Sequence, residues 1–329
     1  MSQCHACHPL ELYYEIRFFG KDNLNYVPQI VNYLHTNRLL INHRNDIIVV
    51  KESGIAGLYD FFSDHMDMDH ISYRIDDQEW KPVHDVLGLI EFKWIDQVIT
   101  EQSVTCHIQP IVDRNERVVA YEMLSRFTDD SGCSISPYQA FSAARRRNRT
   151  YALDRVCRMA AVRSAAMINK KVFINFIPTA IYSPEHCLKS TVRLADQLGI
   201  EPSQFVFEVV ETERVEDIEH LKKILMYYKE KGFHYALDDV GEGFNTLEVL
   251  EELSPHYMKL DMKFVQGVSR DLLKQETAET ILKAAARVGA VPLAEGIEER
   301  EDFIWLKNRG YKLFQGYLFG RPSAISEAL

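Results

Sequence analysis

Eight short apolar runs constrain the fold of this chain more than any other feature. They cover residues 106–112, 118–122, 172–175, 205–208, 235–238, 258–261, 291–295 and 313–315. After the first two, successive runs are separated by about 20–50 residues, which is enough for a helical crossover. Alternating strands and helices predict a parallel sheet, and eight units predict a closed (β/α)8 barrel of the α/β class. Gly232 and Gly289 predict the ends of helices over 217–231 and 276–288.

Polar side chains stand where most of these runs end. In a barrel of this type the functional residues lie at the carboxyl ends of the strands, so these side chains are predicted to converge on one mouth. They are Glu122, Asn175, Glu208, Asp238 with Asp239, Lys259 with Asp261, Glu295 and Gln315. Each acid alone is compatible with a solvated strand end. Their recurrence in successive units favours a shared site.

Asp238 and Asp239 are adjacent carboxylates between a short apolar run and a glycine-rich turn. Two like charges side by side are costly unless a cation or a proton neutralises them, which favours a metal site. The alternative is a helix N-cap followed by a solvated turn, because Asp is a favoured cap residue.

The first part of the chain has a different pattern. Residues 11–94 combine short apolar runs at 46–50 and 57–62 with helical patterning around 27–40, which predicts a small α+β segment. A helix over 88–99 is expected to enter the next domain. We therefore predict two domains, an N-terminal segment over residues 1–95 with a regulatory or sensory role and a barrel over residues 96–329.

Composition excludes several classes of protein. The 329 residues are 46% hydrophobic and 26% charged, which is typical of a soluble globular protein. A net charge of −10 argues against a nucleic-acid polymer as partner, and an anionic substrate would need divalent cations to offset the repulsion. No apolar run approaches the ~20 residues of a membrane span, and no signal peptide is apparent, so a cytoplasmic location is expected.

Three smaller clusters of chemically reactive or charged residues are interpreted as having no functional role. The six cysteines form no disulfide framework, and Cys4, Cys7 and His8 are interpreted as a silent N-terminus rather than a haem or zinc site. Residues 65–70, with alternating His and Asp, are interpreted as a solvated edge. The basic run 145–149 is interpreted as a solvated helix end, in preference to a site for an anion or a partner.

Specific motifs occur in order along the predicted barrel. They are QPI at 109–111, YEMLSR at 121–126, IN at 174–175, FEVVE at 207–211, LDDVGEGF at 237–244, KLD at 259–261, AEGIE at 294–298 and QGYLFGRP at 315–322. Together they resemble the EAL family of cyclic-di-GMP phosphodiesterases over roughly two thirds of the chain. The resemblance implies hydrolysis of cyclic-di-GMP to linear pGpG, in bacterial signalling, by a water activated between two divalent ions, Mg²⁺ or Mn²⁺.

The resemblance also implies roles for individual residues. The metal ligands would be Glu122, Asn175, Glu208, Asp238 and Asp239, with Asp238 bridging the two ions. The catalytic group would comprise Lys259, Glu295, Glu211, Glu298 and Gln315, with Lys259 and Glu295 beside the attacking water. Arg126 and Gln109 would contact the substrate. A homodimer formed through the barrel is implied as well.

The sequence departs from the family pattern at three positions. Met123 replaces the alanine of the name-giving triplet and is expected to alter packing rather than chemistry. Val240 and Glu242 replace phenylalanine and threonine in the glycine loop, which in the family couples metal binding to dimerisation. The alternative function is therefore a silent module that binds cyclic-di-GMP or a protein partner without hydrolysing the nucleotide.

Overall fold

The computed structural model describes residues 11–75, 78–129, 132–209, 218–238, 250 and 252–328. These residues form two compact units. Unit 1 contains the described residues up to Glu101 together with Tyr138–Ala152, and unit 2 contains Gln102–Pro137 and the residues from Leu153 onward. The single helix expected over 88–99 is instead two helices, α3 (Val86–Glu91) and α4 (Trp94–Glu101), and both belong to unit 1.

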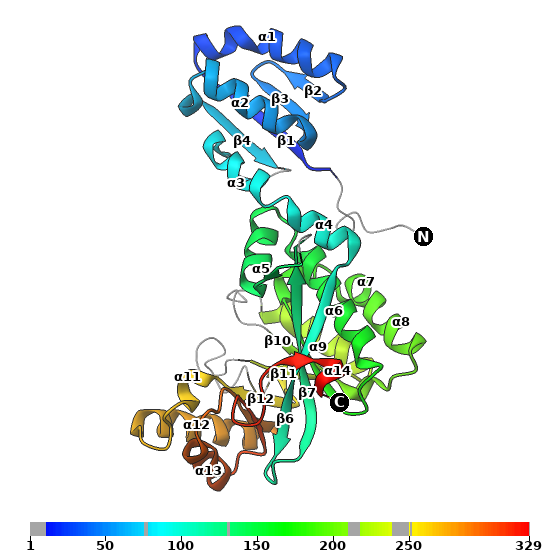
Figure 1. Ribbon diagram of the computed structural model, residues 1–329, viewed down its shortest axis with the longest axis vertical. Coiled ribbons are helices and arrows are strands. Elements are labelled where there is room, and N and C mark those ends of the chain that lie inside the picture. Colours follow the sequence, from blue (N-terminus) through cyan, green and yellow to red (C-terminus); the bar gives the residue numbers. More distant parts are fainter. Residues whose placement is uncertain are drawn as a thin grey trace. The chain divides into compact units, whose positions relative to one another are not determined.

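Unit 1 is an α+β fold, as the sequence predicts. Its antiparallel sheet has the strand order β2-β3-β1-β4-β5, and its first six elements follow the β-α-β-β-α-β order of the ferredoxin-like fold. Helices α1 and α2 cover one face of the sheet (Figure 1). The elements are β1 (Tyr13–Phe18), α1 (Lys21–Thr36), β2 (Leu40–Arg44), β3 (Ile47–Lys51), α2 (Ile55–His65), β4 (Ile71–Ile75), β5 (Lys81–Pro82) and α3 (Val86–Glu91).

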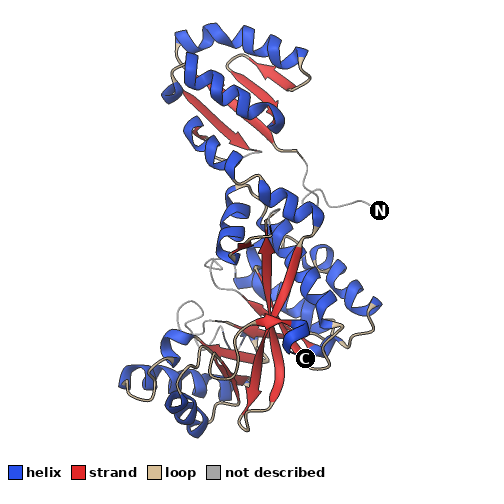
Figure 2. Ribbon diagram, in the orientation of Figure 1, coloured by secondary structure: helices blue, strands red, loops and turns tan. Residues whose placement is uncertain are grey.

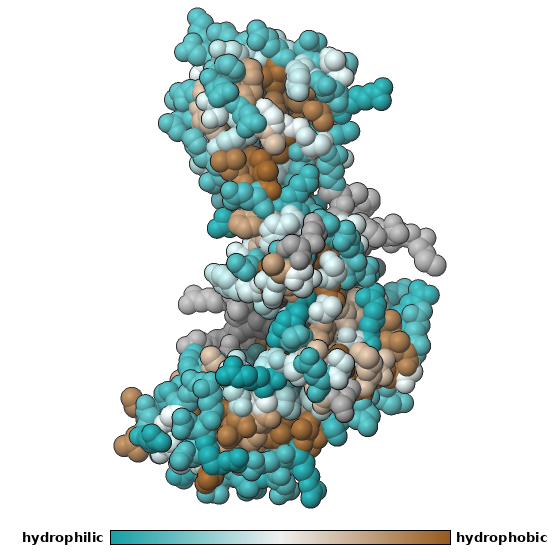
Figure 3. All heavy atoms as spheres, in the orientation of Figure 1, coloured by the Kyte–Doolittle hydropathy of each residue, from teal (hydrophilic) through white to brown (hydrophobic). Residues whose placement is uncertain are grey.

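Alternation along the strands explains how unit 1 builds its core. In β1 the buried residues are Tyr14, Ile16 and Phe18, whereas Tyr13 is exposed and Glu15 and Arg17 are half-buried. Because successive strand side chains point to opposite faces, one face of the sheet packs on the apolar sides of α1 and α2. The outer surface over α1 is mainly hydrophilic (Figure 3), as expected for an amphipathic helix.

The interpretation of residues 145–149 as a solvated helix end is wrong for Arg147. This side chain is fully buried in unit 1, where its guanidinium donates to Glu52 Oε1 at 2.6 Å, to Leu89 O at 2.7 Å and to the Asp96 carboxylate. A buried guanidinium is tolerated only when its charge and its N–H groups are matched in this way. Arg145 and Arg146 are exposed, as the sequence predicts.

Unit 2 is a closed barrel of eight strands, and each strand overlaps one of the eight predicted runs. Figure 2 shows the strands in red with helices beside them. Around the ring the order is β6-β7-β9-β10-β11-β12-β13-β14, and β14 pairs with β6 to close it. The strands are β6 (Val104–Asp113), β7 (Val118–Thr128), β9 (Lys171–Phe176), β10 (Phe205–Val209), β11 (His234–Leu237), β12 (Tyr257–Leu260), β13 (Val291–Ala294) and β14 (Leu313–Gln315).

One strand departs from the expected parallel sheet. β6 runs antiparallel to both of its neighbours in the ring, β7 and β14, whereas the other neighbouring pairs are parallel. The reason is the short connection between β6 and β7, since a parallel pair needs a crossover of about a dozen residues or more. Two short strands extend the sheet, β8 (Ser134–Ile135) on β7 and β15 (Ser323–Ala324) on β6.

Helices connect the parallel strands. They are α5 (Pro137–Arg146), α6 (Thr150–Ala165), α7 (Pro184–Cys187), α8 (Lys189–Gln197), α9 (Ile218–Glu230), α11 (Met262–Val265), α12 (Leu272–Val288), α13 (Arg300–Arg309) and, after β15, α14 (Ile325–Ala328). Asp271 caps α12 by accepting from the N–H groups of Leu273 and Lys274, and Gly289 ends it in the left-handed conformation at φ 76°. Among the described residues, no helix is both long and apolar enough to cross a bilayer.

Candidate active site

A layer of apolar side chains fills the barrel and determines where the polar site lies. Its fully or partly buried members are Ile111, Ala120, Phe173, Val206, Ala236, Tyr257, Leu293 and Leu313. In each parallel strand a predicted site residue follows the layer residue by two positions, and in the antiparallel β6 Gln109 precedes Ile111 by two. Because side chains two apart share a strand face, all these polar groups point inward, one level above the apolar layer.

Glu122 accepts hydrogen bonds from the amide side chains of two other strands. Its Oε1 accepts from Asn175 Nδ2 at 3.0 Å and its Oε2 accepts from Gln315 Nε2 at 2.5 Å. The same Gln315 amide donates to Gln109 Oε1 at 3.1 Å, and Gln109 lies opposite Glu122 in the β6–β7 register. No hydrogen-bond donor among the described residues contacts the Oδ1 of Asn175. The ring therefore fixes a carboxylate without neutralising its charge.

Lys259 forms the centre of the second half of the site. Its ammonium lies 2.6 Å from Glu208 Oε1 and 3.3 Å from Asp238 Oδ1, and it also forms an ion pair with Glu295. Lys259 and Glu208 are almost fully buried, whereas the side chains of Asp238 and Glu295 are 17% and 20% exposed. The mouth is thus open to solvent on the side of Asp238 and Glu295.

The site carries more negative than positive charge. Burial opposes the charge of Lys259, but the Asp238, Glu208 and Glu122 carboxylates outweigh it and raise the pKa of this ammonium. Burial also raises the pKa of Glu208 well above its ordinary value, and the nearby Glu122 and Asp238 add to the effect although Lys259 opposes it. Among the described residues, the Lys259 ammonium is thus surrounded by four carboxylates, those of Glu122, Glu208, Asp238 and Glu295, and it forms ion pairs with the last three.

The donor set fits a hard divalent cation. Glu208 Oε2 and Gln315 Oε1 are buried and accept no hydrogen bond from the part of the chain that the structure describes. Buried oxygens that accept no hydrogen bond from the protein are rare unless they bind a cation or a water molecule. Oxygen ligands with excess negative charge are the environment that Mg²⁺ and Mn²⁺ prefer. Within the described residues, however, no three acidic, histidine or cysteine side chains are already gathered as a metal cluster.

A close backbone contact positions Gln315. Ile297 N donates to Gln315 O at 3.0 Å, and Gly316 follows with φ 156°. A Cβ atom at position 316 would lie 2.1 Å from Ile297 O, so only glycine permits this approach. The Gln-Gly pair thus places the Gln315 amide against Glu122.

Two other predicted site residues, Arg126 and Glu298, lie away from this cluster. Arg126 is half-buried farther along β7, where its guanidinium donates to Ser125 O at 3.0 Å. Glu298 is exposed and accepts from Gln266 Nε2 at 3.4 Å. Glu211 and Asp239 lie outside the described residues, as do Val240 and Glu242 of the glycine loop.

Sequence reasoning missed Asp154 as a positioning residue. From helix α6 its buried carboxylate forms an ion pair with Arg158 and accepts from Ile177 N at 3.0 Å, just after Asn175 at the end of β9. The available signal was an acid and a base four positions apart in a helix, Asp154 being the only acidic residue of α6. Asp154 fixes the chain that follows β9.

The chain is similar in sequence to known proteins. The sequence model of the EAL domain matches residues 93–322. The probable cyclic di-GMP phosphodiesterase PdeG of Escherichia coli is 30% identical over 69% of this chain and 46% of its own length. The blue light- and temperature-regulated antirepressor BluF of the same organism is 23% identical over 70% of this chain and 57% of its own. The chain therefore spans about half the length of these curated relatives.

A solved structure is also similar. It is the cyclic-di-GMP-bound form of a standalone versatile EAL protein from Vibrio cholerae, with 35% identity and a TM-score of 0.59. The match covers 67% of this chain and 92% of that one.

Proposed function

Because this chain belongs to the EAL domain family, we propose that it hydrolyses cyclic-di-GMP to linear pGpG with the help of divalent metal ions. The single observation that carries the proposal is the buried Glu208 carboxylate, whose Oε2 accepts no hydrogen bond from a described residue. Among the described residues at this mouth, the Lys259 ammonium is surrounded by four carboxylates. Such a site has the charge to hold cations against an anionic substrate.

The residues that would hold the metals come from adjacent strands. In the proposal they are Glu122, Asn175, Glu208, Asp238 and Asp239. Two ions of Mg²⁺ or Mn²⁺ would lower the pKa of a water and offset the charge of the phosphodiester. Gln315 and Gln109 are positioning residues, since they orient Glu122 through the Gln315 amide.

Lys259 and Glu295 would act directly on the reacting groups. The Lys259 ammonium would stabilise the charge that develops on the phosphate oxygens. Glu295 is partly exposed at the mouth and would hold the attacking water, accepting its proton at a carboxylate oxygen. The water oxygen forms a bond to phosphorus, the bond from phosphorus to one 3′ oxygen breaks, and that oxygen takes up a proton. The ring then opens with a 5′-phosphate at one end.

A product assay tests this proposal. The full chain is incubated with cyclic-di-GMP and Mg²⁺ or Mn²⁺, and the nucleotides are separated by chromatography. We expect pGpG from the parent and a large loss of pGpG formation for Glu122→Gln, which keeps the size of the side chain and removes its charge. Equal rates for the parent and this variant would contradict the ligand assignment. We include in the proposal a homodimer in solution, which light scattering tests.

A second function is a silent module that binds cyclic-di-GMP or a protein partner. It is favoured by the absence of a preassembled metal cluster among the described residues and by the relative that is named an antirepressor. The same incubation distinguishes the two functions. Bound cyclic-di-GMP that is recovered intact at every metal concentration would support the silent module and reject hydrolysis.

A further inference from the structure

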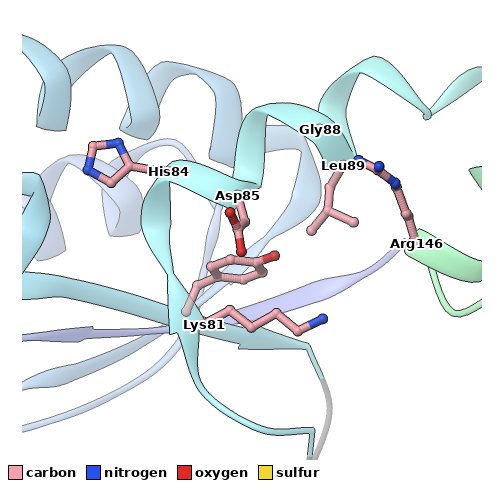
Figure 4. A pocket seen from close by; sticks show the side chains of 7 residues that line it. Lys81, His84, Asp85, Gly88, Leu89 and Arg146 are labelled. Carbon is pink, nitrogen blue, oxygen red and sulfur yellow. The ribbon is translucent and has the colours of Figure 1, made fainter.

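Unit 1 contains a cavity of about 410 Å³ that the proposed function does not use (Figure 4). This volume lies in the range of about 300–1,000 Å³ that is usual for small-molecule sites. The cavity is lined by Tyr73 of β4, Lys81 of β5, the segment His84–Leu89 around the start of α3, and Arg146 at the end of α5. In the view of Figure 4, Asp85 lies between His84 on one side and Arg146 on the other.

Two of the cations that line the cavity have no acidic partner among the described residues. Lys81 forms no ion pair there. Arg146 stacks on the Phe92 ring, with its Cζ 5.1 Å from the ring centroid, and pairs with no described carboxylate. His84 differs, because its Nε2 lies 3.3 Å from Asp69 Oδ1. Unpaired cations are unexpected in a chain of net charge −10 and provide a binding surface for an anion.

Arg146 lies close to helix α3 at Gly88. A Cβ atom at this position would stand 3.6 Å from Arg146 Nη1, which shows how closely the guanidinium approaches the helix backbone. The planar fork of a guanidinium held in this way suits two oxygens of a phosphate group.

Tyr73 and Asp85 add a donor and an acceptor to the same cavity. The Tyr73 hydroxyl forms no hydrogen bond to a described residue. Burial, with a contribution from Asp85, raises the pKa of Tyr73 to about 12, so the hydroxyl remains a donor at neutral pH. The Asp85 carboxylate can only accept, and it therefore requires an O–H or N–H group on the ligand.

The geometry points to a binding site for a phosphate-bearing small molecule, with Lys81 and Arg146 on the phosphate oxygens and Asp85 accepting a hydrogen bond from a ligand O–H or N–H group. The site gives the N-terminal segment a specific ligand class. It is independent of the proposed hydrolysis, and its test measures binding rather than turnover.

Calorimetric titration of the full chain with inorganic phosphate, in metal-free buffer, tests the two cations. We expect Lys81→Met and Arg146→Met each to weaken phosphate binding by about tenfold or more, since each removes a charged hydrogen bond. Lys21→Met and Arg44→Met lower the net charge equally at exposed positions away from the cavity and should leave the affinity unchanged. Equal weakening by all four variants, or no measurable binding to the parent, would overturn the proposal.

Sulfate tests the role of Asp85. Hydrogen phosphate keeps an O–H group that can donate to this carboxylate, whereas sulfate has none and is repelled. At matched ionic strength the parent should therefore bind phosphate more tightly than sulfate, and Asp85→Asn should reduce or reverse that preference. An unchanged preference in Asp85→Asn would contradict the assignment of Asp85. Unaltered thermal unfolding of each variant establishes that it is folded.

Discussion

The Lys259 ammonium lies 2.6 Å from Oε1 of Glu208, and both side chains are almost fully buried at the mouth of the barrel. Lys259 lies on β12 and Glu208 on β10, and β11 separates these strands in the ring, so the ion pair spans three strands. Lys259 also contacts Asp238 and Glu295, and it is therefore the main positive charge that the described residues contribute to this carboxylate ring.

Replacing Lys259 should remove catalysis rather than substrate binding. We expect Lys259→Met to lower kcat for cyclic-di-GMP by about 10²–10³, the usual loss when a charge-stabilising group is removed, with a much smaller change in KM. Steady-state kinetics checks this, with the exposed Lys312→Met as the matched control. A parental kcat in Lys259→Met would exclude it from the chemistry.

Met123 and Glu122 are neighbours with opposite expected effects. Glu122 points into the barrel, whereas Met123 is 3% exposed and points to the other face of β7. Met123→Ala should lower the free energy of unfolding by about 2–5 kcal/mol and leave kcat of the folded protein nearly unchanged. Chemical denaturation and kinetics on the same preparation measure both quantities. A loss of kcat without a loss of stability would show that Met123 shapes the site.

Arg147 should be important for the stability of unit 1. Arg147→Met would leave Glu52 without its buried cation and Asp96 with Arg149 alone, and breaking a buried pair in this way costs about 3–5 kcal/mol. Arg44→Met, at an exposed position of the same unit, should change stability by no more than about 0.5 kcal/mol. Denaturant unfolding followed by tryptophan fluorescence compares them, and similar midpoints for the two variants would be inconsistent with the buried network.

His256 should make unit 2 less stable in mild acid. Burial, together with His234, Lys229 and Lys171, lowers the pKa of His256 to about 4, and its Nδ1 accepts from Tyr235 N at 3.3 Å. Between pH 6.5 and 4 the unfolded chain binds a proton that the folded chain does not, so stability falls as pH falls through this window and is unaffected above it.

The size of this effect is limited because the His256 ring is only half-buried. The slope should be well below the about 1.4 kcal/mol per pH unit of a fully buried group. His256→Asn keeps an acceptor near Nδ1 and cannot titrate, so its unfolding midpoint should fall less than that of the parent between pH 6.5 and 5. Parallel curves for the two proteins would assign the acid sensitivity to other groups.

The barrel was predictable because eight apolar runs alternate with longer segments, and the order of its polar residues was predictable because each stands near the end of a run. A layer residue such as Val206 and a site residue such as Glu208 occupy the same face, and this relation is already visible in the sequence. The reversed direction of β6 followed from the short 114–117 connection, which the sequence also contains. The rule that parallel barrels supply site residues at strand ends does not describe Gln109, which lies in the middle of an antiparallel strand.

Long-range contacts were not predictable in the same way. The burial of Arg147 depends on Glu52 and Asp96, which lie 95 and 51 positions away in the sequence. No local pattern distinguishes Arg147 from the exposed Arg145 and Arg146. The cavity in unit 1 likewise requires β4, β5, α3 and α5 to meet, and only the tertiary structure places Lys81 near Arg146.

The rate of pGpG formation as a function of free Mn²⁺ tests the central claim most directly, with the parent compared with Glu208→Gln. The carboxylate ring predicts no product in excess chelator, a rate that rises to saturation with Mn²⁺ in the parent, and a loss of about 10²-fold or more in Glu208→Gln at every metal concentration. A rate that is independent of Mn²⁺, or a Glu208→Gln variant as active as the parent, would contradict it.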